Sequence, residues 1–131
     1  MVALLAPGLA ALPPRATVGV IYLVGSLCPM TRAHVLILTE GREMLLGREP
    51  SFSLSARAAS AVNSQPTCAR VLGLVGVNGD KWVTDKLRRN GEEALSEDAR
   101  RTVAALSTAH LPWVTLISRG VMSPFLENIE I

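Results

Sequence analysis

The chain has 131 residues, of which 49% are hydrophobic and 18% are charged, and its formal net charge is +2. This length allows one compact domain whose core needs no disulfide or metal, and the composition excludes a largely disordered chain. The positive charge is too small and too scattered to argue for nucleic-acid binding. We expect the basic residues to neutralise the phosphates of a small ligand instead.

The first sixteen residues are apolar, contain three prolines and carry one charge, Arg15. A signal peptide has basic residues ahead of its apolar run, and a membrane span needs about 20 apolar residues, so the segment fits neither. We predict an unstructured extension over residues 1–16 and one domain over residues 17–131. With no targeting or membrane segment evident, a cytoplasmic or nuclear protein is expected, and Cys28 and Cys68 are expected to be thiols.

Residues 17–24 form a nearly continuous run of β-branched and aliphatic side chains, which predicts a strand buried on both faces. Residues 31–46 have helical spacing and end at a glycine. Their expected apolar stripe consists of Val35, Leu38 and Leu45 with Leu36 and Met44 beside them. Residues 47–68 lack any sustained period, which indicates a long surface loop inserted into the domain.

A second buried strand is predicted over residues 69–77, followed by a turn at residues 78–80. Residues 81–93 are polar and basic, with no element assigned to them. Ser96 is placed to cap a helix that ends near His110, with Ala99, Val103 and Leu106 as its buried stripe. Residues 113–118 are a third strand candidate, and residues 119–131 show no strong pattern.

The order strand, helix, strand, helix, strand predicts a parallel sheet with helices packed on its faces, because such crossovers are right-handed. Ligands of these sheets bind at the carboxyl ends of the strands. Residues 25–34, 78–86 and 118–120 are therefore expected to meet in space.

The loop after the first strand has the composition of a phosphate site. Gly25 has no Cβ to keep a phosphate away from the backbone, and the following helix start offers free N–H groups. Thr31 and His34 are three residues apart, so both project from one face of that helix start, with the charge of Arg32 nearby. The ordinary alternative is a Gly-Ser turn, a threonine N-cap and a histidine that only packs. Neither a P-loop nor a dinucleotide-binding glycine pattern occurs in the chain.

This strand, loop and helix resemble the nicotinamide-mononucleotide adenylyltransferases, especially the eukaryotic type. Their signature after the first strand reads Gly-Ser-Phe-x-Pro-x-Thr-x-x-His, and Leu27 stands here in place of the aromatic residue. The residues that match are Gly25, Ser26, Pro29, Thr31 and His34. Later matches to the family's pattern are Gly79-Asp80-Lys81-Trp82, Lys86, Ser96-Glu97-Asp98-Ala99-Arg100 and Trp113-Val114.

The resemblance implies an α/β fold with a Rossmann-like parallel sheet and flanking helices of the nucleotidyltransferase type. It implies transfer of AMP from ATP to nicotinamide mononucleotide, giving NAD and pyrophosphate, with Mg²⁺ carried on the triphosphate. By motif position, Gly25 and Ser26 would cradle phosphate. His34, supported by Thr31, would stabilise the transferring group. Lys86 and Arg100 would hold phosphates from the second crossover, whereas Trp82 and Trp113 are expected to pack.

Three departures leave other interpretations open. Arg119-Gly120 stands where the family has Trp-Glu, Ala99 replaces a histidine, and the late Ile-Ser-Ser-Thr-x-x-Arg motif is not found. The fold is therefore expected to be incomplete, like the first half of an adenylyltransferase, and its exposed sheet edge favours association into homo-oligomers. The alternatives are a catalytically inactive fragment or partner-binding module of that family, and a related nucleotidyltransferase with a different acceptor.

Overall fold

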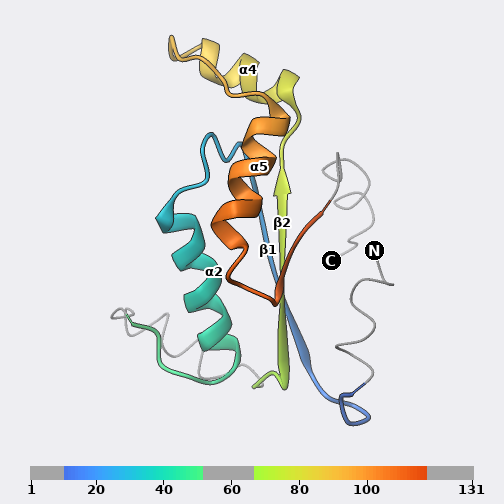
Figure 1. Cartoon of the computed structure of the whole chain (residues 1–131). Helices are drawn as coiled ribbons and strands as arrows, with labels where there is room; N and C mark the ends of the chain where they lie inside the picture. The colour runs from blue at the N-terminus through green and yellow to red at the C-terminus, as the bar shows by residue number, and fades with distance from the viewer. Residues whose placement is uncertain (1–10, 52–66, 118–131) are drawn as a thin grey trace, which may run out of the picture.

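The computed structural model describes residues 11–51 and 67–117. Its elements in chain order are β1 (Val18–Gly25), α2 (Arg32–Leu45), β2 (Arg70–Val77), α4 (Asp80–Arg88), α5 (Glu97–Thr108) and β3 (Val114–Leu116). The strands form one parallel sheet in the order β1-β2-β3 (Figure 1). The domain is therefore α/β and compatible with a Rossmann-like fold. The predictions for residues 1–10, 52–66 and 118–131 lie outside the described residues.

The two long strands are paired along their whole length. Val18 lies opposite Arg70 and Gly25 opposite Val77, while the short β3 joins the other side of β2 from Gly73 to Val75. Both predicted long strands are confirmed to within one residue at each end. Their pairing brings the carboxyl ends of β1 and β2 to the same end of the sheet.

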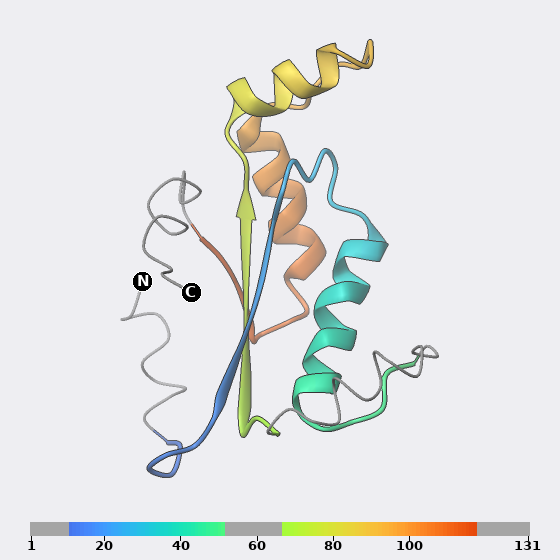
Figure 2. The same ribbon diagram turned by 180° about the vertical axis from the view of Figure 1, so that it is seen from behind.

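Helices α2 and α5 lie on the same side of the sheet in both Figure 1 and Figure 2. Each crossover advances the sheet in the same direction, from β1 to β2 and then to β3, and two connections of one hand place their helices on one face. The prediction that β1 is buried on both faces is therefore wrong. Val20 is 55% exposed and Tyr22 is 41% exposed on the face that no described segment covers.

The core lies between that helical layer and the sheet. Its buried members are Leu27, Met30, Leu38, Val75, Val77 and Ala104. The expected stripe of α2 is confirmed at Leu38, which is fully buried, and is wrong at Leu36, which is 49% exposed. In α5 the buried residues are Arg100, Ala104 and Thr108, and Leu106 is 72% exposed. The stripe predicted for α5 is therefore confirmed at Val103, which packs against the core, and is wrong at Leu106; the buried side instead includes Arg100.

Helix α4 was not predicted. It follows β2 directly, with Asp80 in its first turn and Val83 as its one buried residue. Its nine residues are mostly polar, and a helical pattern is hard to recognise over so short a segment. Lys81 and Asp85 form an ion pair one turn apart, at 2.9 Å, and this hydrogen bond from Lys81 lowers the pKa of the Asp85 carboxyl.

Two smaller expectations concern cysteines and membranes. Cys28 and Cys68 are not joined by a disulfide, as expected. Over residues 11–51 and 67–117, none of the helices combines the length and the apolar character that a membrane span requires.

Candidate functional site

The loop between β1 and α2 lies at the carboxyl end of the sheet. The Gly25 carbonyl accepts a hydrogen bond from the Asn78 N–H at 2.9 Å, which ties the start of the loop to the end of β2. The expected meeting of residues 25–34 with the region after β2 is confirmed at these residues. Residues 118–120, expected at the same place, lie outside the described residues.

Thr31 and His34 form a reciprocal cap at the start of α2. The His34 Nδ1 atom accepts a hydrogen bond from the Thr31 backbone N–H at 3.0 Å and lies 2.8 Å from the Thr31 hydroxyl oxygen. A ring nitrogen that accepts a hydrogen bond carries no proton, so the neutral imidazole carries its proton on Nε2. The cap therefore fixes the ring and leaves Nε2–H as a donor.

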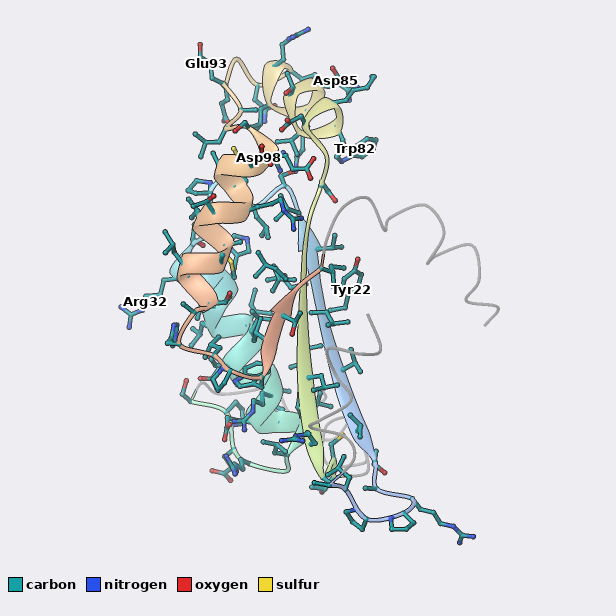
Figure 3. All side chains as sticks on the ribbon, turned by 45° about the vertical axis from the view of Figure 1, so that its right-hand side comes forward. Tyr22, Arg32, Trp82, Asp85, Glu93 and Asp98 are labelled. Carbon is teal, nitrogen blue, oxygen red and sulfur yellow. The ribbon has the colours of Figure 1, made fainter. Side chains whose placement is uncertain are left out.

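The first turn of α2 has a charge pattern unlike that of the other helices. It contains no acid and carries Arg32, whereas α4 begins with Asp80 and α5 with Glu97 and Asp98. A cation is unfavourable beside the positive end of a helix dipole, and an anion bound there would reverse that effect. Figure 3 shows the Arg32 side chain extending away from the body of the protein. Within the described structure, the N–H groups of Arg32 and Ala33 have no acceptor.

Leu27 holds the loop in an unusual conformation. Its φ is +42°, in the left-handed region that a branched side chain rarely adopts, and its side chain is buried in the core. Met30 is also buried, and the Cys28 sulfur accepts a hydrogen bond from the Leu95 N–H at 3.3 Å. The loop is therefore anchored from below by two side chains and from the side by the segment that precedes α5.

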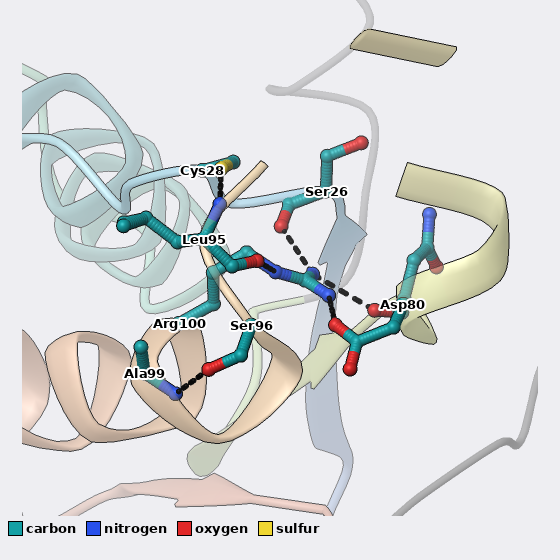
Figure 4. A network of polar contacts seen from close by, with 8 residues as sticks. Ser26, Cys28, Asp80, Leu95, Ser96, Ala99 and Arg100 are labelled. Carbon is teal, nitrogen blue, oxygen red and sulfur yellow. Dashed lines mark hydrogen bonds and ion pairs between the residues drawn. The ribbon is translucent and has the colours of Figure 1, made fainter. Parts of the chain in front are cut away.

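Arg100 is fully buried beneath this loop, and its guanidinium group makes four hydrogen bonds (Figure 4). Nε donates to the Leu95 carbonyl at 2.9 Å, and Nη1 donates to the carbonyls of Ser26 and Asn78, both at 2.8 Å. Nη2 donates to Asp80 Oδ1 at 2.9 Å, the ion pair of the site. One side chain of α5 thus joins the loop, the end of β2 and the start of α4.

These contacts change the role expected of Arg100. Because its donors are engaged by protein acceptors and its side chain has no exposed surface, we assign it to positioning the loop rather than to holding a phosphate. Two of the later motif matches are in direct contact, because Asp80 of the Gly79-Asp80 turn forms an ion pair with Arg100. Lys86 lies exposed in the last turn of α4.

Asn78 was interpreted only as part of a turn, but it is a further polar residue of the site. Its Oδ1 atom is buried and has no hydrogen-bond partner within the described structure. Buried polar atoms are nearly always paired, so this oxygen is an exception to the rule, but because it has no exposed surface a ligand does not reach it in this conformation. The only sequence signal for it was its position directly after a buried strand.

The remaining predicted residues differ in their surroundings. A Cβ added at Gly25 would have the Leu27 side chain as its nearest neighbour, at 3.7 Å, so the protein itself leaves room there. Figure 4 shows the Ser26 hydroxyl turned away from Arg100. Trp113 packs against the core as expected, with the Arg42 guanidinium 5.3 Å from its ring centroid. The prediction that Trp82 packs is wrong. Trp82 is 69% exposed, because the residue that α4 buries is its neighbour Val83.

Comparisons with family models, with curated proteins and with solved structures gave no match to this chain. A functional proposal therefore depends on the residues and geometry of the loop itself.

Proposed function

We propose that the Gly25–His34 loop binds the triphosphate of ATP and that the domain is of the nucleotidyltransferase type. The residues that match the family signature lie together at the carboxyl end of β1 and at the start of α2. This is the end of a parallel sheet at which nucleotides bind. The basic first turn of α2 and its unpaired N–H groups add to the argument for an anion.

The observation that carries the proposal is the orientation of His34. Since its Nδ1 atom accepts the Thr31 N–H, the proton lies on Nε2, and a neutral imidazole can donate to a phosphate oxygen. An ordinary capping box uses Glu or Gln at this position. A histidine that replaces them keeps the cap and adds a donor where an acid would repel phosphate.

The reaction we propose is adenylyl transfer. The phosphate oxygen of nicotinamide mononucleotide attacks the α-phosphorus of ATP, the bond from that phosphorus to the bridging oxygen breaks, and pyrophosphate leaves with the bond's electron pair. No protein nucleophile takes part, so the protein contributes position and charge stabilisation. Mg²⁺ would enter bound to the triphosphate; the described residues hold no group of three His, Cys, Asp or Glu side chains suited to a metal.

Each residue of the site then has a separate task. Gly25 and Ser26 admit the phosphates to the backbone, and His34, fixed by Thr31, donates to the group being transferred. Arg100 positions the loop from below. Lys86 supplies an exposed cation on α4.

One observation favours a second candidate, an ATP-binding module without transfer. Doubly wound sheets bind ligands where the strand order reverses, between neighbouring strands with helices on opposite faces. In the described residues β1 has a neighbouring strand on one side only, which is β2. Within this part of the chain, the loop after β1 therefore lacks the second neighbouring strand that would complete such a crevice. The second candidate would bind the triphosphate and leave nicotinamide mononucleotide unused.

The test compares the wild type with Gly25→Ala. The added methyl group meets no protein atom closer than 3.7 Å, so we expect an unchanged melting temperature. In calorimetric titrations with Mg·ATP, affinity should fall by a factor on the order of ten or more, about 1.4 kcal/mol. A matched assay with ATP and nicotinamide mononucleotide separates the candidates: NAD formation supports transfer, and ATP binding without NAD supports the binding module. Wild-type protein that binds no ATP contradicts both.

A further inference from the structure

The free edge of β1 is the strongest feature that the proposed function does not use. In a parallel ladder the N–H and C=O of one residue point to the same side, and successive residues alternate. The Gly25 carbonyl accepts a hydrogen bond from the Asn78 N–H, which follows β2 in the chain. The backbone N–H and C=O groups of the odd-numbered residues of β1 therefore point toward β2. Val18, Val20, Tyr22 and Val24 therefore direct their backbone groups outward, and no described segment pairs with them.

This edge lacks the devices that keep strand edges apart. Natural edge strands are usually protected by lysines, prolines, bulges or short length. β1 is eight residues long, is paired without interruption to β2, and has neither a charged residue nor a proline. Its composition is that of a strand that pairs on both sides.

The flank of α2 above this edge is also apolar and exposed. Gly41 lies against Ile21 of β1, since an added Cβ would be 3.2 Å from its Cδ1 atom, whereas Arg42 reaches Trp113 beside β3. Ile37 is one turn before Gly41 and so shares its side of the helix, toward the free edge. Ile37 is 58% exposed.

The other face of the sheet continues the same surface. Val20 and Tyr22 are exposed there, and Figure 3 shows Tyr22 on the side of the sheet away from α2 and α5. In the described part of the chain, an unpaired backbone edge thus lies between an apolar helix flank and an apolar sheet face. An occupant must supply a strand of its own, uncharged and apolar on both faces.

We propose that this occupant is β1 of a second copy, paired antiparallel about a twofold axis near Ile21. Such an interface is closed and places the same surface opposite itself. About this axis Val20 lies opposite Tyr22 of the other copy, and Val18 lies opposite Val24. A β-branched residue opposite an aromatic one is a favourable cross-strand pair, and no like charges meet. The exposed Ile37 flanks of the two α2 helices approach each other on the helical side.

The test introduces charges at the paired positions and follows the oligomeric state of the full chain by analytical ultracentrifugation. Wild type should sediment as a dimer at micromolar concentration. Val20→Lys/Tyr22→Lys and Val20→Glu/Tyr22→Glu should each be monomeric, because like charges then lie opposite each other, and an equimolar mixture should form a heterodimer. Circular dichroism of each variant reports that the fold is retained.

Leu106→Lys is the matched control, since Leu106 is 72% exposed on α5, away from this edge, and its variant should remain dimeric. The proposal is overturned by a monomeric or larger wild-type species, by loss of the dimer in Leu106→Lys, or by a mixture of the charged variants that stays monomeric. None of these readouts depends on ATP, so this inference and the proposed function can fail separately.

Discussion

Arg100 connects three parts of the chain through one planar group. It bonds to carbonyls that belong to the loop, to the end of β2 and to the segment before α5. A guanidinium spreads its donors over three nitrogens in a fixed plane, so it can reach acceptors on different sides, whereas a lysine has all its donors on one atom. The conformation of the Ser26–Thr31 loop therefore depends on a residue that lies about seventy positions further along the chain.

Arg100→Met tests this dependence. The methionine fills similar space but leaves three carbonyls unpaired, so we expect the free energy of unfolding in urea to fall by about 3 kcal/mol. Arg101→Met is the matched control, because within the described residues Arg101 makes one side-chain hydrogen bond, to the Ile117 carbonyl at 3.2 Å. Equal effects of the two substitutions would show that the network at Arg100 has no special role.

His34 combines a structural role with the proposed chemical one. Its Nδ1 atom caps α2, and this contact alone explains why a polar residue stands at that position. The cap does not explain why the residue is a histidine, since an acid would cap better beside the helix dipole. The two roles can be separated by substitution because only one of them requires the Nε2 donor.

At the scale of elements, β2 and β3 approach closely because Gly73 has no side chain. A Cβ added there would lie 2.8 Å from both Trp113 Cζ3 and Val114 Cγ2. The Trp-Val pair that resembles the family pattern thus has a packing explanation in this chain. It holds β3 against β2 and takes no part in the loop.

Gly73→Ala should therefore destabilise the protein by about 1–3 kcal/mol, as expected for overpacking of a tight contact. Thermal or urea unfolding followed by circular dichroism measures the effect. Gly25→Ala is the comparison, because its added Cβ has no close neighbour. A Gly73 variant as stable as the Gly25 variant would contradict the described packing of Trp113.

The elements were predictable where one periodic pattern extended over many residues. The strands and helices over residues 18–25, 32–45, 70–77 and 97–108 follow from such patterns. Helix α4 was missed because it is short and mostly polar, and the stripe predicted for α5 is wrong at Leu106, since the buried side includes Arg100. A buried charge that is paired through distant acceptors leaves no signal in local hydropathy.

For the molecule as a whole, the alternation of strand and helix patterns in the sequence predicted the parallel sheet. It did not predict that α2 and α5 both cover the same face of that sheet. That covering follows from the strand order β1-β2-β3, which hydropathy alone does not specify. The location of the candidate site was predictable, since a glycine-containing loop after a buried strand lies at the ligand-binding end. The inward orientation of Arg100 and the unpaired Asn78 Oδ1 were not predictable, because both depend on tertiary contacts.

The most direct test of the central claim, that this loop binds a triphosphate through His34, is Mg·ATP calorimetry on His34→Glu. Glutamate at this position preserves the cap and suits the helix dipole, so stability should be retained, while its charge opposes phosphate. We predict a loss of affinity on the order of a hundredfold, about 3 kcal/mol. His110→Glu, the same substitution outside the loop, should bind as wild type does. ATP affinity unchanged in His34→Glu would contradict the account and leave His34 as a helix cap alone.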